Sequence, residues 1–282
     1  MSANTTRRNF LMGSAALAGL DLAGRADSTA AGPARSYELK LGIASYSLRE
    51  FSRNLALKMI KELGTPYVNF KDVHLPYEIS DEDFQRFRKR IQEAGIIITG
   101  GGTISMKKDD DASIRRHFEY ARKWGLPMMV IAPTRQTLPR IEKFVKEYNT
   151  RVAVHNHGPE DKHFPSPYDV LEVIQQMDSR MGLCADLGHA LRTGTDVVKA
   201  LADAGSRLFD VHIKDLRDPK QKDSQCDVGE GVMPVPAIFR QLLKMRFAGN
   251  VALEYEINEF APLEGMKKSL AYMRGVLDGL KA

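Results

Sequence analysis

Residues 128–157 read MMVIAPTRQTLPRIEKFVKEYNTRVAVHNH and contain one complete strand–helix–strand repeat. The two ends, Met128–Ile131 and Val152–His155, are apolar runs of strand length. Between them, Leu138–Tyr148 repeats its apolar residues at the spacing of one helix face. The stretch therefore predicts one unit of an α/β fold.

The same pattern recurs along the chain at a spacing of about 30 residues. The predicted strands are Leu39–Ala44, Tyr67–Phe70, Ile96–Thr99, Met128–Ile131, Val152–His155, Leu183–Asp186, Leu208–Ile213 and Asn250–Glu256. The predicted helices are Asn54–Leu63, Asp81–Ala94, Asp110–Trp124, Leu138–Tyr148, Tyr168–Met177, Asp196–Ala204, Val235–Met245 and Leu263–Leu280. Eight such repeats predict a (β/α)8 TIM barrel.

An open, doubly wound sheet is the alternative architecture. It is disfavoured because no Gly-x-Gly-x-x-Gly motif follows the first strand. Gly100-Gly101-Gly102 stands at the end of the third predicted strand, where it predicts a backbone turn over the barrel mouth.

The composition is that of a globular protein. The 282 residues are 43% hydrophobic and 27% charged and include only two cysteines, which excludes a disulfide scaffold or a disordered chain. Cys184 lies in an apolar run and Cys226 in a loop, and we expect no bridge between them. The net charge of +5 is spread without a Lys/Arg block, so no nucleic-acid partner is expected.

The amino terminus has the features of an export signal. Arg7 and Arg8 precede Phe-Leu, and an apolar Ala/Gly-rich run leads to the small residues Ser28–Ala31. We therefore predict a cleavable twin-arginine signal and short linker over residues 1–34, a single barrel domain over residues 35–282, and a periplasmic location. The apolar run is too short for a stable membrane anchor.

Polar residues collect where the predicted strands end. The segments are Lys71-Asp72-Val73-His74, His155-Asn156-His157 with Glu160, Asp186-Leu187-Gly188-His189, His212-Ile213-Lys214-Asp215 and Glu254-Tyr255-Glu256. They contain five of the seven histidines of the chain. In a TIM barrel these ends form the active-site face.

Strand alternation directs several of these side chains into the barrel mouth. His155 and His157 share one face of their strand, and Glu254 and Glu256 share one face of theirs. Together with Asp186 they would repel one another or be left unpaired unless a divalent cation compensates them. Two alternatives remain open: Asp186 caps the following helix, and Glu254 pairs with Lys214.

These strand ends, with the Gly229-Glu230-Gly231 loop, resemble the xylose-isomerase-like TIM-barrel superfamily from about Leu39 to the end of the chain. That group includes sugar-phosphate isomerases and epimerases, inosose dehydratases and apurinic endonucleases. The nuclease branch is disfavoured because Gln225 stands where that branch has a histidine, and because the third strand ends in glycines.

The resemblance implies one metal ligand from each of the last four strands. Asp186, His212 and Glu254 match three of them, and His155 stands where many epimerases have a glutamate. His157 and Glu160 are alternatives to His155. The ion is expected to be Mn²⁺, Mg²⁺, Co²⁺ or Zn²⁺.

The departure on the fifth strand puts the two-glutamate proton relay of ketohexose epimerases in doubt. The acid and base are instead expected among Glu256, His157 and Glu160. His189, Lys214, His74 and Lys71 are expected to contact substrate.

The expected chemistry is enolisation next to a carbonyl, which a divalent ion promotes as a Lewis acid. Returning the proton gives a sugar isomerase or epimerase, and loss of a β-leaving group gives a dehydratase or lyase. A small carbohydrate such as a keto-sugar is the expected partner, and a homo-oligomer is compatible with the sequence. A non-catalytic periplasmic carbohydrate-binding barrel and a metal-dependent hydrolase, including an AP endonuclease, are the less favoured alternatives.

The twin-arginine prediction is tested by changing Arg7 and Arg8 together to lysine. We expect the precursor to stay in the cytoplasm while the barrel still folds, because the change alters only the export signal. Cell fractionation with blotting checks this, and normal export of the double variant contradicts the prediction.

Overall fold

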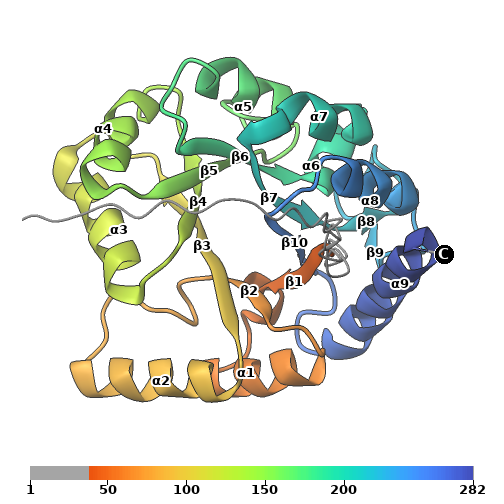
Figure 1. Ribbon diagram of the computed structural model, residues 1–282, viewed down its shortest axis with the longest axis horizontal. Helices are drawn as coiled ribbons and strands as arrows, with labels where there is room; N and C mark the ends of the chain where they lie inside the picture. The colour runs from red at the N-terminus through yellow and green to blue at the C-terminus, as the bar shows by residue number, and fades with distance from the viewer. Residues whose placement is uncertain (1–37, 282) are drawn as a thin grey trace, which may run out of the picture. The chain divides into compact units, whose positions relative to one another are not determined.

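The structure, a computed structural model, describes residues 38–281 and shows a closed barrel of parallel strands surrounded by helices (Figure 1). The barrel strands are β1 (Lys40–Ala44), β2 (Tyr67–Phe70), β3 (Ile97–Met106), β4 (Met128–Pro133), β5 (Arg151–His155), β6 (Met181–Asp186), β7 (Leu208–Ile213) and β10 (Asn250–Leu253). They pair in the circular order β1-β10-β7-β6-β5-β4-β3-β2. The predicted TIM barrel is confirmed.

The helices form the outer layer of the barrel (Figure 1). They are α1 (Arg53–Glu62), α2 (Asp81–Glu93), α3 (Asp111–Trp124), α4 (Leu138–Tyr148), α5 (Pro167–Ile174), α6 (Leu187–Arg192), α7 (Val197–Ala204), α8 (Val235–Lys244) and α9 (Leu263–Lys281). Ser52, Ser80 and Asp110 cap α1, α2 and α3, each accepting a hydrogen bond from a backbone N–H of the first turn. The short helix α6 is not among the predicted helices.

The described residues 38–281 belong to one compact unit. The predicted signal over residues 1–34 lies outside the described residues. Within the part of the chain that the structure describes, no helix is long and apolar enough to cross a membrane.

The side chains of the strands alternate between two hydrophobic layers. Val152 and Val154 of β5 belong to the large core between the strands and the helices. Ala153, between them, belongs to a smaller cluster with Val130 and Phe209. Since neighbouring strand residues face opposite ways, this smaller cluster fills the barrel interior. His155 follows the same alternation and faces inward with Ala153, as predicted.

The third strand is longer than predicted. Gly100–Gly102 do not form a turn, because β3 runs through them to Met106. These glycines allow a close approach of neighbouring segments: a Cβ on Gly101 would lie 2.4 Å from Leu126 Cδ1, and one on Gly102 would lie 2.1 Å from the carbonyl oxygen of Val130. The turn prediction was wrong because glycine here serves packing rather than chain reversal.

The last barrel strand is shorter than predicted and ends at Leu253 rather than Glu256. After one more backbone bond, from the N–H of Glu254 to the carbonyl oxygen of Ile213 at 3.0 Å, the next two N–H groups bond to side chains instead of to a neighbouring strand. The N–H of Tyr255 donates to Ser47 Oγ at 2.8 Å, and the N–H of Glu256 donates to Gln225 Oε1 at 3.1 Å. The Gln225 side chain also donates to the Glu254 carbonyl oxygen at 2.8 Å, so it fixes the segment that holds both glutamates.

Asp215 organises the long connection after β7. This connection contains a small antiparallel pair, β8 (Asp215–Leu216) and β9 (Gln225–Cys226). The buried Asp215 carboxylate accepts backbone N–H bonds from Gly229 at 2.9 Å, Gly231 at 3.1 Å and Met233 at 2.8 Å. The Gly229-Glu230-Gly231 sequence is therefore a turn built around one carboxylate.

Replacing Asp215 with alanine should lower the free energy of unfolding by about 2–4 kcal/mol, because several buried N–H donors lose a charged acceptor. Urea unfolding followed by circular dichroism measures this loss. Asp223→Ala, at an exposed position of the same connection, is the matched control and should cost less than about 0.5 kcal/mol. Equal losses in the two variants would show that Asp215 does not organise the connection.

Candidate active site

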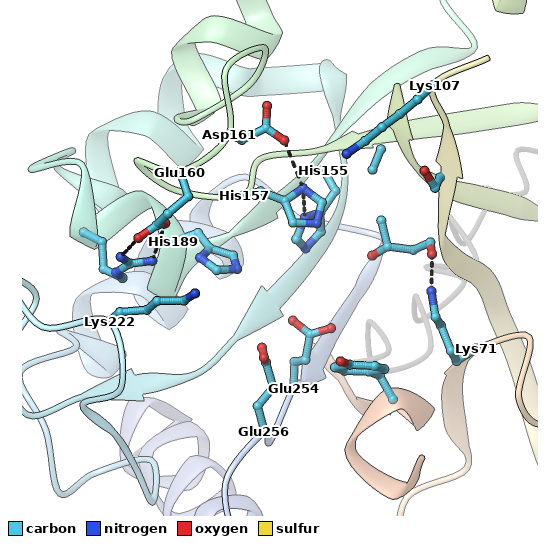
Figure 2. A pocket seen from close by; sticks show the side chains of 15 residues that line it. Lys71, Lys107, His155, His157, Glu160, Asp161, His189, Lys222, Glu254 and Glu256 are labelled. Carbon is cyan, nitrogen blue, oxygen red and sulfur yellow. Dashed lines mark hydrogen bonds and ion pairs between the residues drawn. The ribbon is translucent and has the colours of Figure 1, made fainter. Parts of the chain in front are cut away.

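A cavity of about 510 Å³ opens at the carboxyl ends of the barrel strands (Figure 2). Its volume lies in the usual range for small-molecule sites, about 300–1,000 Å³. The predicted site residues that line it are Lys71, His155, His157, Glu160, His189, Glu254 and Glu256. The structure therefore brings together most of the residues predicted from the strand ends.

Four buried side chains converge at the inner end of this cavity: His155, Asp186, His212 and Glu254. His155 Nε2 lies 3.2 Å from His212 Nδ1 and 3.4 Å from Asp186 Oδ2. His212 Nδ1 lies 3.4 Å from Glu254 Oε1. One ligand atom from each of the four lies within 4.8 Å of the others. We refer to these four residues as the ligand cluster.

The spacing in the ligand cluster fits a divalent cation. A tetrahedral ion with bonds of about 2.1 Å separates its ligand atoms by about 3.4 Å. Asp186 Oδ2 is buried and accepts no aligned hydrogen bond, although the Lys214 ammonium lies 3.1 Å away, so a lone pair remains available for an ion. Two imidazoles and two carboxylates form a donor set that suits zinc and other first-row divalent ions. The same four residues were predicted as the metal ligands.

Asp186 and Glu254 each use their two oxygens for different purposes. Asp186 Oδ1 accepts the N–H of His189 at 2.8 Å and caps α6, while Oδ2 faces the ligand cluster. Glu254 Oε2 accepts from Lys214 Nζ at 2.8 Å, while Oε1 faces His212. The capping and ion-pairing alternatives considered from the sequence are therefore both present, and neither removes the residue from the cluster.

Lys214 is the buried cation of the site. Its Nζ lies 3.1 Å from Asp186 Oδ2 and also contacts the carboxylates of Glu254 and Glu256. Burial opposes the charged form, but these carboxylates outweigh it and raise the pKa of Lys214 well above its usual value. Lys214 was predicted to contact substrate, but it lies behind the carboxylates and is not among the residues that line the cavity.

The protonation states of His155, Asp186 and Glu254 follow from burial and from Lys214. Burial lowers the pKa of His155 to about 3, so this imidazole is neutral near pH 7, as a metal ligand must be. Burial would raise the pKa of Asp186 and of Glu254, but the Lys214 ammonium outweighs it and lowers both. Both carboxylates are therefore charged.

The second nitrogen of each cluster histidine faces a polar neighbour. His212 Nε2 lies 3.1 Å from Nδ2 of the Asn69 amide, whose Oδ1 has no hydrogen-bond partner. If the amide is turned over, that oxygen accepts the Nε2–H and leaves Nδ1 free to ligate. His155 Nδ1 lies 3.3 Å from His157 Nδ1, which can accept a hydrogen bond from the Nδ1–H of His155. Asn69 and His157 are thus placed to orient the two imidazoles.

The three predicted acid–base residues occupy different surroundings. Glu256 is part-buried beside Lys214, and His157 lies on the other side of the cavity (Figure 2). Glu160 accepts hydrogen bonds from the Arg192 guanidinium, which lower its pKa to about 2. Because a base held at so low a pKa accepts protons poorly, Glu160 suits substrate contact better than proton transfer.

Two of the predicted substrate-binding residues, His189 and Lys71, line the cavity, but His74 does not. The His74 side chain is fully buried beneath the loop after β1, with Nδ1 2.9 Å from Ser45 Oγ and Nε2 3.3 Å from the Phe51 carbonyl oxygen. This placement corrects the expectation that His74 contacts substrate. The chain turns after Lys71, so His74 packs under the strand ends rather than over them.

Several residues that line the cavity were not predicted from the sequence. Tyr46, Ser105, Lys107, Arg192 and Lys222 all reach the cavity. Ser105 and Lys107 were missed because β3 was predicted to end at Thr99, six residues before Ser105. Tyr46 follows β1 by two residues and was within reach of the strand-end argument, whereas Arg192 and Lys222 lie on a helix and a loop that gave no such signal.

Comparison with curated proteins finds inosose dehydratase from Mesomycoplasma hyopneumoniae strain 7448, 26% identical over 161 residues. The match covers 50% of this chain and 53% of the relative, so it spans only about half the length of that protein.

Two solved structures share the fold. The 3-keto-D-glucoside 4-epimerase from E. coli has a TM-score of 0.69 at 18% identity, covering 84% of this chain and 100% of that one. A zinc-bound IOLI protein has a TM-score of 0.72 at 17% identity, covering 86% of this chain and 99% of the other.

A family model described as the xylose isomerase-like TIM barrel matches residues 57–276. This range includes the ligand cluster and most of the residues that line the cavity. The chain therefore belongs to the xylose isomerase-like TIM-barrel family.

Proposed function

We propose that this protein is a divalent-metal-dependent isomerase or epimerase that enolises a keto-sugar. The observation that supports the proposal best is the ligand cluster, whose four donor atoms converge at the inner end of a cavity of about 510 Å³. The names of the relatives, a dehydratase and a keto-glucoside epimerase, agree with carbonyl chemistry on carbohydrates.

His155, Asp186, His212 and Glu254 would hold the ion. A divalent cation there would supply Lewis-acid polarisation of the sugar carbonyl and stabilise the negative charge that develops on enolisation. Lys214 stays beside the carboxylates and holds Glu254 in place through its 2.8 Å contact. The strand ends that carry these residues are rigid parts of the barrel, which favours a fixed donor geometry.

Glu256 and His157 are the proposed proton-transfer groups. They lie on opposite sides of the cavity, so a sugar bound between them presents one face to each (Figure 2). Glu256 removes the proton from the carbon next to the carbonyl, and His157 returns one to the other face, which inverts that carbon. The same pair suits isomerisation when the proton returns to the neighbouring carbon.

Elimination is the second candidate reaction. The match to inosose dehydratase favours it, because the alignment covers half of this chain. In that case Glu256 removes the proton and His157 protonates the departing β-hydroxyl.

A small carbohydrate remains the proposed partner, and the amino-terminal pattern leads us to propose action in the periplasm after export.

The metal proposal predicts the behaviour of three substitutions. Asp186→Asn, His212→Ala and Glu254→Gln should each weaken metal binding by at least about tenfold, because each removes a ligand atom. Metal titration of the stripped proteins by calorimetry measures the loss. Glu160→Gln is the control, since Glu160 lines the cavity outside the ligand cluster and should keep full affinity. Unchanged affinity in all three ligand variants would show that the ion binds elsewhere.

The reaction proposal predicts exchange of a sugar proton with solvent. NMR spectra of keto-sugars and keto-glycosides in D₂O with the metal-loaded protein should show deuterium entering the carbon next to the carbonyl. Glu256→Gln should keep the metal but reduce exchange by about 10²–10⁴-fold, as loss of a general base does. Binding without exchange would indicate a carbohydrate-binding barrel, and release of fragments would indicate a hydrolase.

A further inference from the structure

The acids that line the cavity already have partners. Glu160 is paired with Arg192, and Glu254 and Glu256 are paired with Lys214. Asp161 accepts backbone N–H bonds from His163 at 2.7 Å and from Phe164 at 3.0 Å. A divalent ion in the ligand cluster would neutralise Asp186 and Glu254 further. Among the described residues that line the cavity, Asp161 is therefore the one acid whose charge is not balanced by a cation, because its two partners are neutral N–H groups.

Two lysines on the opposite arc of the barrel are not balanced in this way. Lys71 follows β2 and Lys107 follows β3, whereas the residues of the ligand cluster lie at or next to the ends of β5, β6, β7 and β10. Lys107 extends across the cavity rim toward His157 (Figure 2). Among residues 38–281 it forms neither an ion pair nor a side-chain hydrogen bond.

Lys71 is held in place without being neutralised. Its Nζ donates to the backbone carbonyl oxygen of Thr103 and lies 6.0 Å from the centre of the Tyr46 ring. The nearest carboxylate oxygen, from Asp72, is 3.9 Å away and belongs to a side chain that is 47% exposed. A solvent-exposed partner beyond hydrogen-bond distance screens the ammonium only weakly. We call Lys71 and Lys107 the lysine wall.

We infer that the substrate carries an anionic group, a carboxylate or a phosphate, which the lysine wall binds while the carbonyl end of the molecule faces the ligand cluster. The inference rests on the proposed function and narrows its substrate class from keto-sugars in general to acidic ones. Ammonium groups form charge-assisted hydrogen bonds with such oxyanions, and these are stronger than bonds to neutral hydroxyls.

The wall lies on the other half of the barrel from the ligand cluster, so a charge at the far end of a sugar reaches it without displacing the carbonyl end. Lys222 and Arg192 enter the cavity from the side of Glu160, whose carboxylate balances one of them. Lys222, the one that is not paired with Glu160, adds positive potential to the same cavity and favours entry of an anion.

The test compares three sugars that differ only at carbon 6: D-fructose, D-fructuronate and D-fructose 6-phosphate. Calorimetry with the Mn²⁺-loaded protein should show that at least one acidic sugar binds about tenfold or more tightly than fructose. The carboxylate and phosphate arms show which oxyanion is preferred. Raising the salt concentration should weaken the acidic sugars but leave fructose unchanged.

Lys71→Met and Lys107→Met should each weaken binding of the acidic sugar by a larger factor than binding of fructose, and so remove most of the preference for the acidic sugar. Lys108→Met is the matched control: it makes the same change of charge at the next residue, which is paired with Asp110 at 3.1 Å outside the cavity. It should keep the preference.

Equal or weaker binding of both acidic sugars, including no binding of either, overturns the inference. So does an equal loss of acidic and neutral binding in the wall variants. Failure of the proposed function gives a different result: the protein would not bind the metal ion, or no sugar, acidic or neutral, would exchange a proton with solvent. Exchange confined to fructose and other neutral sugars would leave the proposed function intact and reject the anionic substrate alone.

Discussion

The site depends on the electrostatic balance around one buried ammonium. Lys214 lies within ion-pair distance of Asp186, Glu254 and Glu256, and the first two of these carboxylates are buried with it. Buried carboxylates that close together repel one another unless cations compensate them. Lys214 supplies one positive charge and leaves a net negative charge among the carboxylates. A divalent cation held by Asp186 and Glu254, with His155 and His212, would complete the balance.

This balance explains why single residues serve two purposes. Asp186 caps α6 with one oxygen and faces the cluster with the other, and Glu254 divides its oxygens between Lys214 and His212. Each carboxylate is held by one strong partner while its second oxygen stays directed into the site. Such outer contacts fix the orientation of ligands before an ion arrives, which favours a defined coordination geometry.

The long connection after β7 orients residues at the rim of the cavity in a similar way, through hydrogen bonds made outside the ligand cluster. Asp215 gathers the backbone of Gly229, Gly231 and Met233, and Gln225 bonds the backbone on both sides of Tyr255. The loop therefore positions Glu254 and Glu256 although it supplies neither. In the sequence, Gly229-Glu230-Gly231 is one of the motifs that resemble the family. In the structure, this segment forms a turn because the Asp215 carboxylate accepts hydrogen bonds from its backbone.

The sequence by itself determined the barrel, because the alternation of strands and helices follows from apolar patterns within short stretches of chain. Most predicted strand and helix boundaries agree with the structure to within a few residues. It also determined which side chains point inward, since alternation along a strand needs no tertiary information. Tertiary structure decided the rest. The course of β3 through Gly100–Gly102 depends on packing against Leu126 and Val130, which a local pattern does not contain. The burial of His74, the placement of Lys214 behind the carboxylates and the exposure of Lys107 to the cavity depend on side chains that are distant in sequence and meet only when the barrel closes.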